Sequence, residues 1–174
     1  MNRSENGASN LNAVLQKALN PNTAALKRGG TEYRLGDKVM QIKNNYEKNQ
    51  FNGDIGVITG IDLDGRTISV TFDNQPVEYD ISELDELVLS YAVTIHKSQG
   101  SEYPIVIMPF TMQFYVMLQK NLLYTGITRA KKAIVIVGTK KAIGFAVRNS
   151  DVAKRNTGLA RRLVDVFESK RNGI

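Results

Sequence analysis

The sequence LVLSYAVTIHKSQGSEYPIVIMPF, residues 87–110, decides the fold of this chain. It holds two apolar runs, Leu87–Ile95 and Val106–Pro109 with Ile105 before it, and polar residues follow directly after the first run. A third apolar run lies at Ala133–Val137. Segments with helical periodicity fall between and after these runs, at Met112–Leu118, Leu122–Arg129, Lys141–Val147 and Leu159–Phe167. Strands that alternate with helices predict a parallel α/β sheet.

Upstream of this region the pattern changes to short strands with Asn- and Asp-rich breaks. We predict strands at Lys38–Ile42, Ile55–Ile61, Thr67–Phe72 and Val77–Ile81. Asp64-Gly65 lies between two alternating runs and predicts a two-residue hairpin turn in which both residues have positive φ. Such a set of short, closely spaced strands predicts a small SH3-like β-barrel.

The beginning of the chain predicts a helix that packs on the α/β sheet. Asn10 can cap this helix, Asn20-Pro21 ends it, and its apolar positions recur at helical spacing, at Leu11, Val14, Leu15, Ala18 and Leu19. The predicted domains are therefore residues 1–34, the first part of the α/β domain; residues 35–85, an inserted barrel; and residues 86–174, the remaining α/β domain with a basic C-terminal helix.

Composition excludes several classes of function. The 174 residues include no cysteine, which excludes disulfides and thiolate metal sites and predicts a reducing, cytoplasmic location. The single histidine, His96, leaves almost nothing for a zinc site. The sequence contains no run of eighteen apolar residues, so it predicts no membrane span.

The net charge of +6 is unevenly distributed along the chain. Residues 1–119 hold 10 Lys and Arg against 14 Asp and Glu, whereas residues 120–174 hold 13 against 3. A segment with this excess of basic residues suits a polyanion such as nucleic acid or a nucleotide phosphate. A solvated basic helix explains the same charge equally well.

The first polar cluster, Thr94–Glu102, follows the predicted strand Leu87–Ile95. In open α/β sheets the carboxyl ends of the strands are where ligands bind. The side chains of Thr94, His96, Lys97 and Ser98 can donate hydrogen bonds to a phosphate. Gly100 permits a ligand to approach the backbone closely, and Glu102 can accept a hydrogen bond from a ribose hydroxyl. A well-capped turn explains any one of these residues, but the whole string favours binding.

The second cluster, Asn121–Lys132, is an apolar helix that carries Arg129 near its end. A rigidly held arginine can offer a bidentate contact to a phosphoryl group, as an arginine finger does. Arg129 can equally be a residue that favours the helix C-terminal dipole.

Together these segments resemble a known family. Thr94–Glu102 resembles motif V of superfamily 1 helicases, Thr-x-His-Lys-x-Gln-Gly-x-Glu, and Leu123–Lys131 resembles their motif VI, Tyr-x-Gly-Ile-Thr-Arg-Ala-Lys. Gly36–Gln41, Asn45-Tyr46, Phe51–Gly56 and the pairs Leu11-Asn12, Leu15-Gln16 and Leu19-Asn20-Pro21 are similar to the RecD-type branch, which includes the exodeoxyribonuclease V alpha subunit. The resemblance implies a RecA-like sheet, the second motor domain, interrupted by the barrel. It also implies ATP-driven 5′→3′ movement on single-stranded DNA, in DNA repair and recombination.

The resemblance implies a role for each matching residue. Arg129 takes the position that reaches the γ-phosphate of ATP between two RecA-like domains, and Arg3 takes the position of the motif IV arginine that faces the same phosphate. Gln99, Gly100 and Glu102 lie on the nucleotide side of motif V. Thr94, His96, Lys97 and Ser98 lie on its DNA side. The barrel, which has few basic residues, is expected to flank the DNA path.

The sequence lacks Gly-x-x-x-x-Gly-Lys-Ser/Thr and an identifiable acidic Mg²⁺ motif. We therefore expect a C-terminal fragment whose partner is the N-terminal RecA-like domain of the same protein, which supplies the Mg²⁺ ligands and without which this chain is inactive. The other expected partners are single-stranded DNA and, in a complex, further nuclease subunits. The alternatives are a non-catalytic nucleic-acid-binding module and a subunit scaffold.

Overall fold

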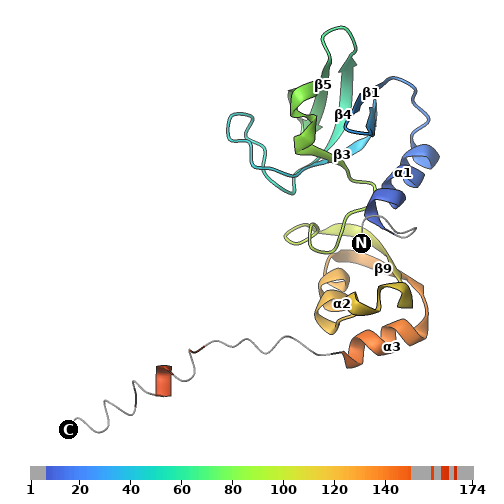
Figure 1. The fold of residues 1–174 in the computed structure, drawn as a ribbon, viewed down its shortest axis with the longest axis vertical. Coiled ribbons are helices and arrows are strands. Elements are labelled where there is room, and N and C mark those ends of the chain that lie inside the picture. Colours follow the sequence, from blue (N-terminus) through green and yellow to red (C-terminus); the bar gives the residue numbers. More distant parts are fainter. Residues whose placement is uncertain (1–6, 150–157, 159–161, 165–166, 168–174) are drawn as a thin grey trace.

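A computed structural model describes residues 7–149, 158, 162–164 and 167. These residues form two lobes joined by one crossing of the chain (Figure 1). In chain order the elements are α1 (Ala8–Leu19), β1 (Ala25–Arg28), β2 (Thr31–Arg34), β3 (Lys38–Gln41), β4 (Ile55–Asp62), β5 (Thr67–Phe72), β6 (Gln75–Asp80), η1 (Ile81–Glu86), β7 (Leu87–Leu89), β8 (Tyr103–Phe110), η2 (Met112–Met117), α2 (Lys120–Ile127), β9 (Ala130–Gly138) and α3 (Lys140–Arg148). Of the helices in these residues, none combines the length and apolar character that crossing a membrane requires.

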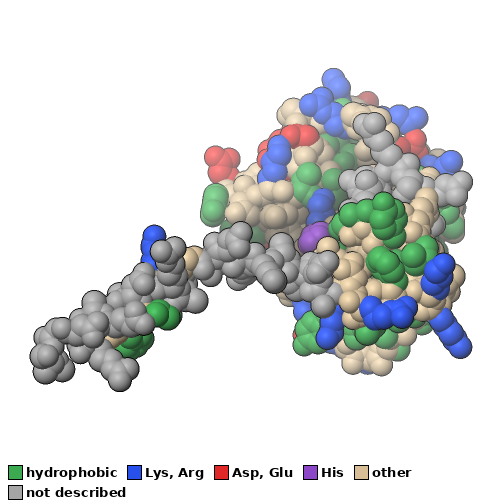
Figure 2. Space-filling model, turned by 60° about the horizontal axis from the view of Figure 1, so that its bottom comes forward, with side chains coloured by type: hydrophobic (Ala, Val, Ile, Leu, Met, Phe, Trp, Pro, Cys, Tyr) green, Lys and Arg blue, Asp and Glu red, His purple; other side chains and the backbone are tan. Residues whose placement is uncertain are grey.

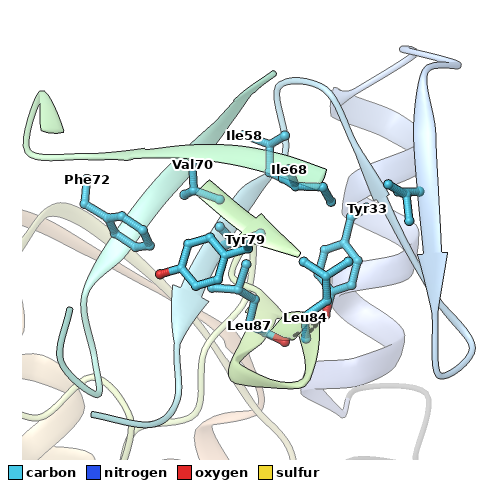
Figure 3. Packing of buried hydrophobic residues seen from close by; sticks show 10 residues of the cluster. Tyr33, Ile58, Ile68, Val70, Phe72, Tyr79, Leu84 and Leu87 are labelled. Carbon is cyan, nitrogen blue, oxygen red and sulfur yellow. Dashed lines mark hydrogen bonds between the residues drawn. The ribbon is translucent and has the colours of Figure 1, made fainter. Parts of the chain in front are cut away.

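The first lobe is a five-stranded antiparallel sheet in the order β6-β5-β4-β3-β7. All four strands predicted in this part of the chain are confirmed, since β5 spans the predicted residues and β3, β4 and β6 differ from them only at their ends. Alternate residues of β5 enter a core that also contains side chains from η1 and β7 (Figure 3). The predicted small barrel is an open one: in the described residues no ladder joins β6 to β7.

The predicted turn at Asp64-Gly65 is wrong in its geometry. The loop between β4 and β5 has four residues, and its positive φ (56°) falls on Arg66. The Asp62 carboxylate organises this loop because it accepts hydrogen bonds from the backbone N–H groups of Asp64 and Gly65. Two-residue turns with positive φ at both positions occur instead at Asp73-Asn74 and Gly29-Gly30.

The run Leu87–Ile95 was expected to form a strand of the α/β sheet, and this prediction is wrong. β7 ends at Leu89 and pairs antiparallel with β3 of the first lobe, with Val39 opposite Leu89. Leu87 is buried in the first core, which fixes the strand there. Residues 90–102 then cross to the second lobe without regular structure. The domain limits at residues 34/35 and 85/86 stay a prediction.

The second lobe contains the predicted parallel pair, β8 and β9. One face of this pair packs against side chains from η2, α2 and α3 around Met108 and Phe110. The other face is bare in the described residues, since Ile105, Ile107, Val135 and Val137 are all exposed. The predicted helices at 112–118, 122–129 and 141–147 are confirmed as η2, α2 and α3, although η2 is a 3₁₀ helix. Most of the helix predicted at 159–167 lies outside the described residues; those described, 162–164 and 167, are helical.

α1 is present, but it begins earlier and faces the other way. Its N-cap is Gly7 rather than Asn10. Its buried residues are polar, at Asn12 and Gln16, whereas Val14 and Leu19 are 54% and 66% exposed. The expected inward apolar face is therefore wrong in its main contact: the buried residues of α1 are polar and Gln16 donates to the buried carboxylate of Asp37, while Leu11 and Leu15 are only half-buried.

Candidate functional site

The 94–102 segment is a compact series of turns at the junction of the two lobes. Thr94 organises its start: the Ser98 N–H donates to the Thr94 carbonyl (3.0 Å) and the Lys97 N–H donates to the Thr94 hydroxyl (3.3 Å). Further along, the Ser101 N–H donates to the Ser98 carbonyl (3.1 Å). These local bonds hold the segment in place of the strand end predicted from the sequence.

The predicted binding residues of this segment differ in how they meet solvent. His96, Lys97, Gln99, Gly100 and Glu102 are exposed, so they are open to a ligand. Ser98 is buried, and its hydroxyl donates to the Ile95 carbonyl (2.8 Å). Ser98 therefore stabilises the turn with the group that the sequence suggested for phosphate.

A shallow hollow lies beside this segment. Its lining combines the first turn of α1, strand β7 and the side of the turn that carries Thr94 and Lys97. A hydroxyl and an ammonium group at the rim of one depression are a chemically suitable set for a phosphate oxygen. Thr94 and Lys97 thus line one hollow, whereas His96 and Ser98, the other residues that the resemblance assigns to the DNA side, do not; the DNA-binding role of all four stays a prediction.

Arg129 lies just after α2 and reaches back to the 94–102 segment. Its guanidinium makes three hydrogen bonds: Nη1 donates to the Ser101 carbonyl (3.1 Å), Nε to the Thr125 carbonyl (3.3 Å) and Nη2 to the Thr128 hydroxyl (3.3 Å). The side chain is half-buried rather than enclosed by apolar residues. Among the described residues no carboxylate forms an ion pair with Arg129, so its charge is met only by neutral oxygens.

The 123–131 segment packs directly on the 94–102 segment. Lys131 forms an ion pair with Glu102 (Nζ–Oε2 3.0 Å), and the Tyr103 N–H donates to the Arg129 carbonyl (2.8 Å). Gly126 faces β8, where an added Cβ would lie 2.7 Å from the Met108 sulfur. The structure therefore brings the two predicted clusters together, and the pairing of Glu102 with Lys131 leaves Arg129 without this acid.

Arg3, the second predicted arginine, lies outside the described residues. A metal site is also missing from the described part of the chain, which holds no group of three or more His, Asp or Glu side chains able to bind an ion.

The lysines of the first lobe are largely neutralised by acids. Lys43 pairs with Asp85, and this hydrogen bond raises the pKa of Lys43 and lowers the pKa of Asp85. Lys48 pairs with Glu83; burial acts to raise the pKa of Glu83, but the hydrogen bonds from Lys48 and the Asp80 N–H leave it lowered. On the face shown in Figure 2, Lys and Arg side chains are dispersed among uncharged ones rather than gathered in one patch. The paired lysines of the first lobe therefore predict little electrostatic attraction of a polyanion to that lobe.

A second set of polar residues, for which no role in the site was predicted, lies beside it. This set consists of Asn12 and Gln16 on α1, the α1 C-cap Asn20, and Asp37 and Tyr91, which form hydrogen bonds next to the 94–102 segment. Their spacing of four residues on one helix is the signal that could have identified the α1 members as one buried face.

Family models and curated relatives match both parts of the chain. The family model described as the ATP-dependent RecD-like DNA helicase SH3 domain matches residues 11–72, and the UvrD-like helicase C-terminal domain matches residues 89–137. The chain is 36% identical over 157 residues to the ATP-dependent RecD2 DNA helicase of Deinococcus radiodurans, covering 90% of this chain and 22% of that protein. It is 31% identical over 160 residues to the RecBCD enzyme subunit RecD of Haemophilus influenzae, covering 92% and 23%.

A solved structure is similar in fold. The Pif1 helicase from Bacteroides, in complex with ADP-AlF3 and single-stranded DNA, superposes with a TM-score of 0.54 at 18% identity, covering 92% of this chain and 43% of that one. The chain spans about a fifth of the length of the curated relatives above.

Proposed function

Because the chain belongs to the RecD-type branch of superfamily 1 DNA helicases, we propose that it forms the second motor domain of an ATP-dependent 5′→3′ helicase or translocase. In this proposal ATP binds between this chain and an N-terminal RecA-like domain of the same protein. Single-stranded DNA passes along the junction of the two lobes, and the activity serves DNA repair and recombination in the cytoplasm. The chain alone, which has no phosphate-binding loop, does not hydrolyse ATP and binds DNA weakly.

The state of Arg129 carries this proposal. A guanidinium that is bonded only to two carbonyls and a hydroxyl keeps a full positive charge without a compensating acid. A γ-phosphate offers charged acceptors in bidentate geometry, which bind more strongly than neutral oxygens. Arg129 can therefore exchange its present partners for ATP, as an arginine finger does.

The 94–102 segment has two sides in this proposal. Gln99, Gly100 and Glu102 approach the nucleotide, and their exposure beside Arg129 supports this assignment. Thr94, His96 and Lys97 approach the DNA backbone, and the hollow at Thr94 and Lys97 supports this side. Ser98 contributes by holding the turn between the two sides.

The proposed cycle is a charge switch. ATP draws Arg129 away from the Ser101 carbonyl and closes the two domains; hydrolysis removes the γ-phosphate, and Arg129 returns to Ser101. Because this bond joins the two motif segments, its loss changes the support of the 94–102 segment while that segment contacts DNA. In this proposal the Mg²⁺ ligands belong to the N-terminal RecA-like domain, so no step of this cycle is assigned to a metal on this chain.

The test is Arg129→Ala in a protein that contains this chain together with the phosphate-binding domain. We expect the ATPase kcat to fall by about 10³-fold or more, the usual contribution of an arginine finger, with DNA affinity nearly unchanged. Arg129→Lys should recover little, because an ammonium group cannot make the bidentate contact.

Arg148→Ala is the matched control, since Arg148 is an exposed arginine of the same lobe that donates to a helix carbonyl. It should leave both activities unchanged. Equal loss of ATPase and DNA binding in Arg129→Ala would place Arg129 on the DNA or in the fold, and would contradict the proposal.

A subunit-scaffold role is the second candidate, favoured by the bare apolar face of β8 and β9. The Haemophilus relative is named as a subunit of a larger enzyme. Co-purification with further nuclease subunits, together with DNA binding that ignores ATP in the longer protein, would favour this candidate over the motor.

A further inference from the structure

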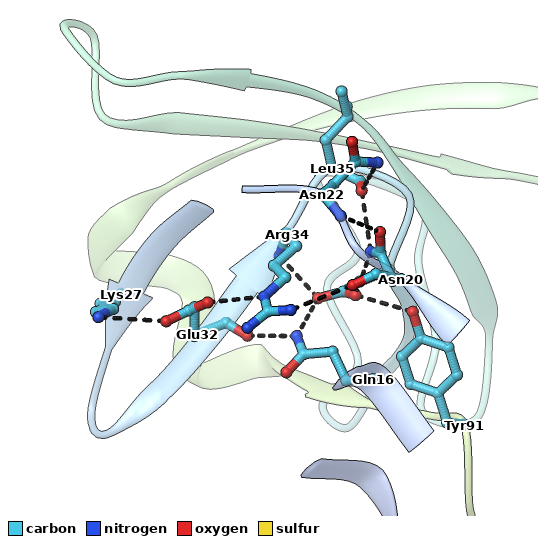
Figure 4. Close-up of polar contacts among 9 residues, drawn as sticks. Gln16, Asn20, Asn22, Lys27, Glu32, Arg34, Leu35 and Tyr91 are labelled. Carbon is cyan, nitrogen blue, oxygen red and sulfur yellow. Dashed lines mark hydrogen bonds and ion pairs between the residues drawn. The ribbon is translucent and has the colours of Figure 1, made fainter. Parts of the chain in front are cut away.

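A buried carboxylate organises the contact between α1, the first sheet and residue 91 (Figure 4). Asp37 is fully buried. Its Oδ1 accepts from the Asn20 amide (2.7 Å) and the Tyr91 hydroxyl (2.9 Å), and its Oδ2 accepts from the Gln16 amide (2.5 Å) and the Arg34 N–H (2.7 Å). A carboxylate has about four lone-pair sites, so these donors fill it. In the described residues no Lys or Arg forms an ion pair with Asp37, so oriented dipoles alone hold it.

The amides of α1 have no free donor in this arrangement. Gln16 donates its second N–H to the Glu32 carbonyl (2.8 Å), and Asn20 donates its second N–H to the Leu35 carbonyl (3.0 Å). Hydrogen bonds weaken steeply when they are bent, so a fully used set of amides permits one orientation of α1 on the first lobe.

The same helix also holds the entrance to the 94–102 segment. Asn12 donates to the Ala92 carbonyl (2.8 Å) and accepts from the Ala92 N–H (2.9 Å), so its side chain replaces a strand partner for this residue. Tyr91, the preceding residue, is bonded to Asp37. Two consecutive residues just before Thr94 are thus fixed from the α1 side.

Asp37 is in turn part of the first sheet. The Ile58 N–H of β4 donates to the Asp37 carbonyl (2.9 Å), and the Gly36 N–H donates to the Ile58 carbonyl (2.8 Å). The path from β4 through Asp37 to Tyr91 is therefore continuous and made of directional bonds.

We propose that Asn12, Asp37 and Tyr91 are positioning residues that transmit the position of the first sheet to the 94–102 segment. This inference rests on the proposed function and deepens it: when DNA at the junction of the lobes displaces the first sheet, this path carries the displacement to the nucleotide side. A DNA strand that moves the sheet thereby moves Gln99, Gly100 and Glu102.

Hydrogen exchange on the 174-residue chain tests the positioning itself. Tyr91→Phe removes only the hydroxyl that donates to Asp37, and Asn12→Ala removes the clamp on Ala92. In both variants the amides of residues 97–101 should exchange roughly tenfold faster, the effect of one lost hydrogen bond. Tyr33→Phe is the matched control, because its buried hydroxyl donates to the Leu84 and Leu87 carbonyls within the first lobe. Equal exchange of residues 97–101 in all three variants would overturn the proposal.

Stimulation of the ATPase by DNA, measured in a protein that also contains the phosphate-binding domain, tests the transmission. Tyr91→Phe should lower the ratio of DNA-stimulated to basal kcat by roughly fivefold, whereas Tyr33→Phe should not alter the ratio. A changed exchange rate with an unchanged ratio would overturn transmission. A wild-type protein without ATPase would instead contradict the proposed function and leave the exchange result standing.

Discussion

Arg129 and Asp37 carry opposite charges, and each is held by neutral groups rather than by an ion partner. Their surroundings give them different uses. Arg129 is half-buried and keeps donors that can turn to a new acceptor, whereas Asp37 is sealed from solvent with all its acceptor sites occupied. The first arrangement suits a group that must change partner, and the second suits a group that must not.

The rigid role of Asp37 predicts the effect of Asp37→Asn on stability. The new NH₂ group would face donors where an oxygen now accepts, so buried N–H or O–H groups lose their partner. We expect the free energy of unfolding in urea to fall by about 2–4 kcal/mol.

Asp73→Asn is the control for this substitution. Asp73 is exposed in a turn and has a φ of 42°, a conformation that Asn also adopts readily. It should change the free energy of unfolding by less than about 0.5 kcal/mol. A loss as small as this in Asp37→Asn would show that its hydrogen bonds do not stabilise the fold.

The two motif segments were predictable at this scale, because their residues are contiguous and their polar character is unusual after an apolar run. The Asp37 network was not, because its members lie 21, 17 and 54 residues apart from Asp37 in sequence. Only the fold brings such residues together.

Among the elements, β3 to β6 were predicted because short apolar runs between Asn- and Asp-rich breaks are a local property, whereas the hairpin of β1 and β2 was not predicted. Two predictions failed where the strand or residue that an element packs against decided its place, rather than the element's own apolar pattern. Leu87–Ile95 is apolar throughout, but β3 supplies a partner only as far as Leu89. α1 has a helical apolar stripe, yet its polar face is the one that meets Asp37.

Gly138, at the end of the β8–β9 pair, is expected not to tolerate a side chain. A Cβ there would lie 1.9 Å from the Phe110 carbonyl oxygen, and a backbone atom cannot move aside as a side chain can. Gly138→Ala should lower the free energy of unfolding by about 3 kcal/mol, measured by thermal or urea denaturation.

Gly144→Ala provides the contrast for this prediction. In α3 the nearest atom to an added Cβ is the Arg148 guanidinium at 3.7 Å, so there is room. Alanine favours a helix over glycine by about 1 kcal/mol, and this variant should be more stable than wild type. Similar stability of the two variants would contradict the close approach at Gly138.

Over the whole molecule, the two lobes have separate apolar cores. The core of the first lobe is the better sealed, with Val39, Ile68, Val70 and Tyr79 fully buried. The fold class was predictable because each lobe follows a local pattern. The junction was not, because it depends on hydrogen bonds between side chains distant in sequence.

Two buried tyrosines, Tyr33 and Tyr79, and the half-buried Tyr91 predict how stability depends on pH. Burial raises the pKa of Tyr33 to about 12, and burial and the hydrogen bond to Asp37 raise the pKa of Tyr91 to about 12; burial also raises the pKa of Tyr79. Tyrosine in an unfolded chain has a pKa of about 10. The folded state thus favours the neutral form, so its contribution is complete below about pH 10 and is lost as the pH rises to about 12.

The free energy of unfolding should therefore be level near pH 8 and should fall between about pH 10 and 12, in step with tyrosinate absorbance. Tyr33→Phe should reduce the slope of this fall. Tyrosines that all titrate near pH 10 in the folded protein would contradict the prediction.

Because α1 buries polar residues and exposes apolar ones, the effects of natural substitutions in this helix differ from what hydrophobicity suggests. Scales that judge a substitution by lost hydrophobicity would score Val14→Lys or Leu19→Lys as harmful, and Gln16→Leu as harmless. With water on one side of the helix and a carboxylate on the other, the ranking for folding of this chain runs the opposite way: the lysines are tolerated and the leucine is not.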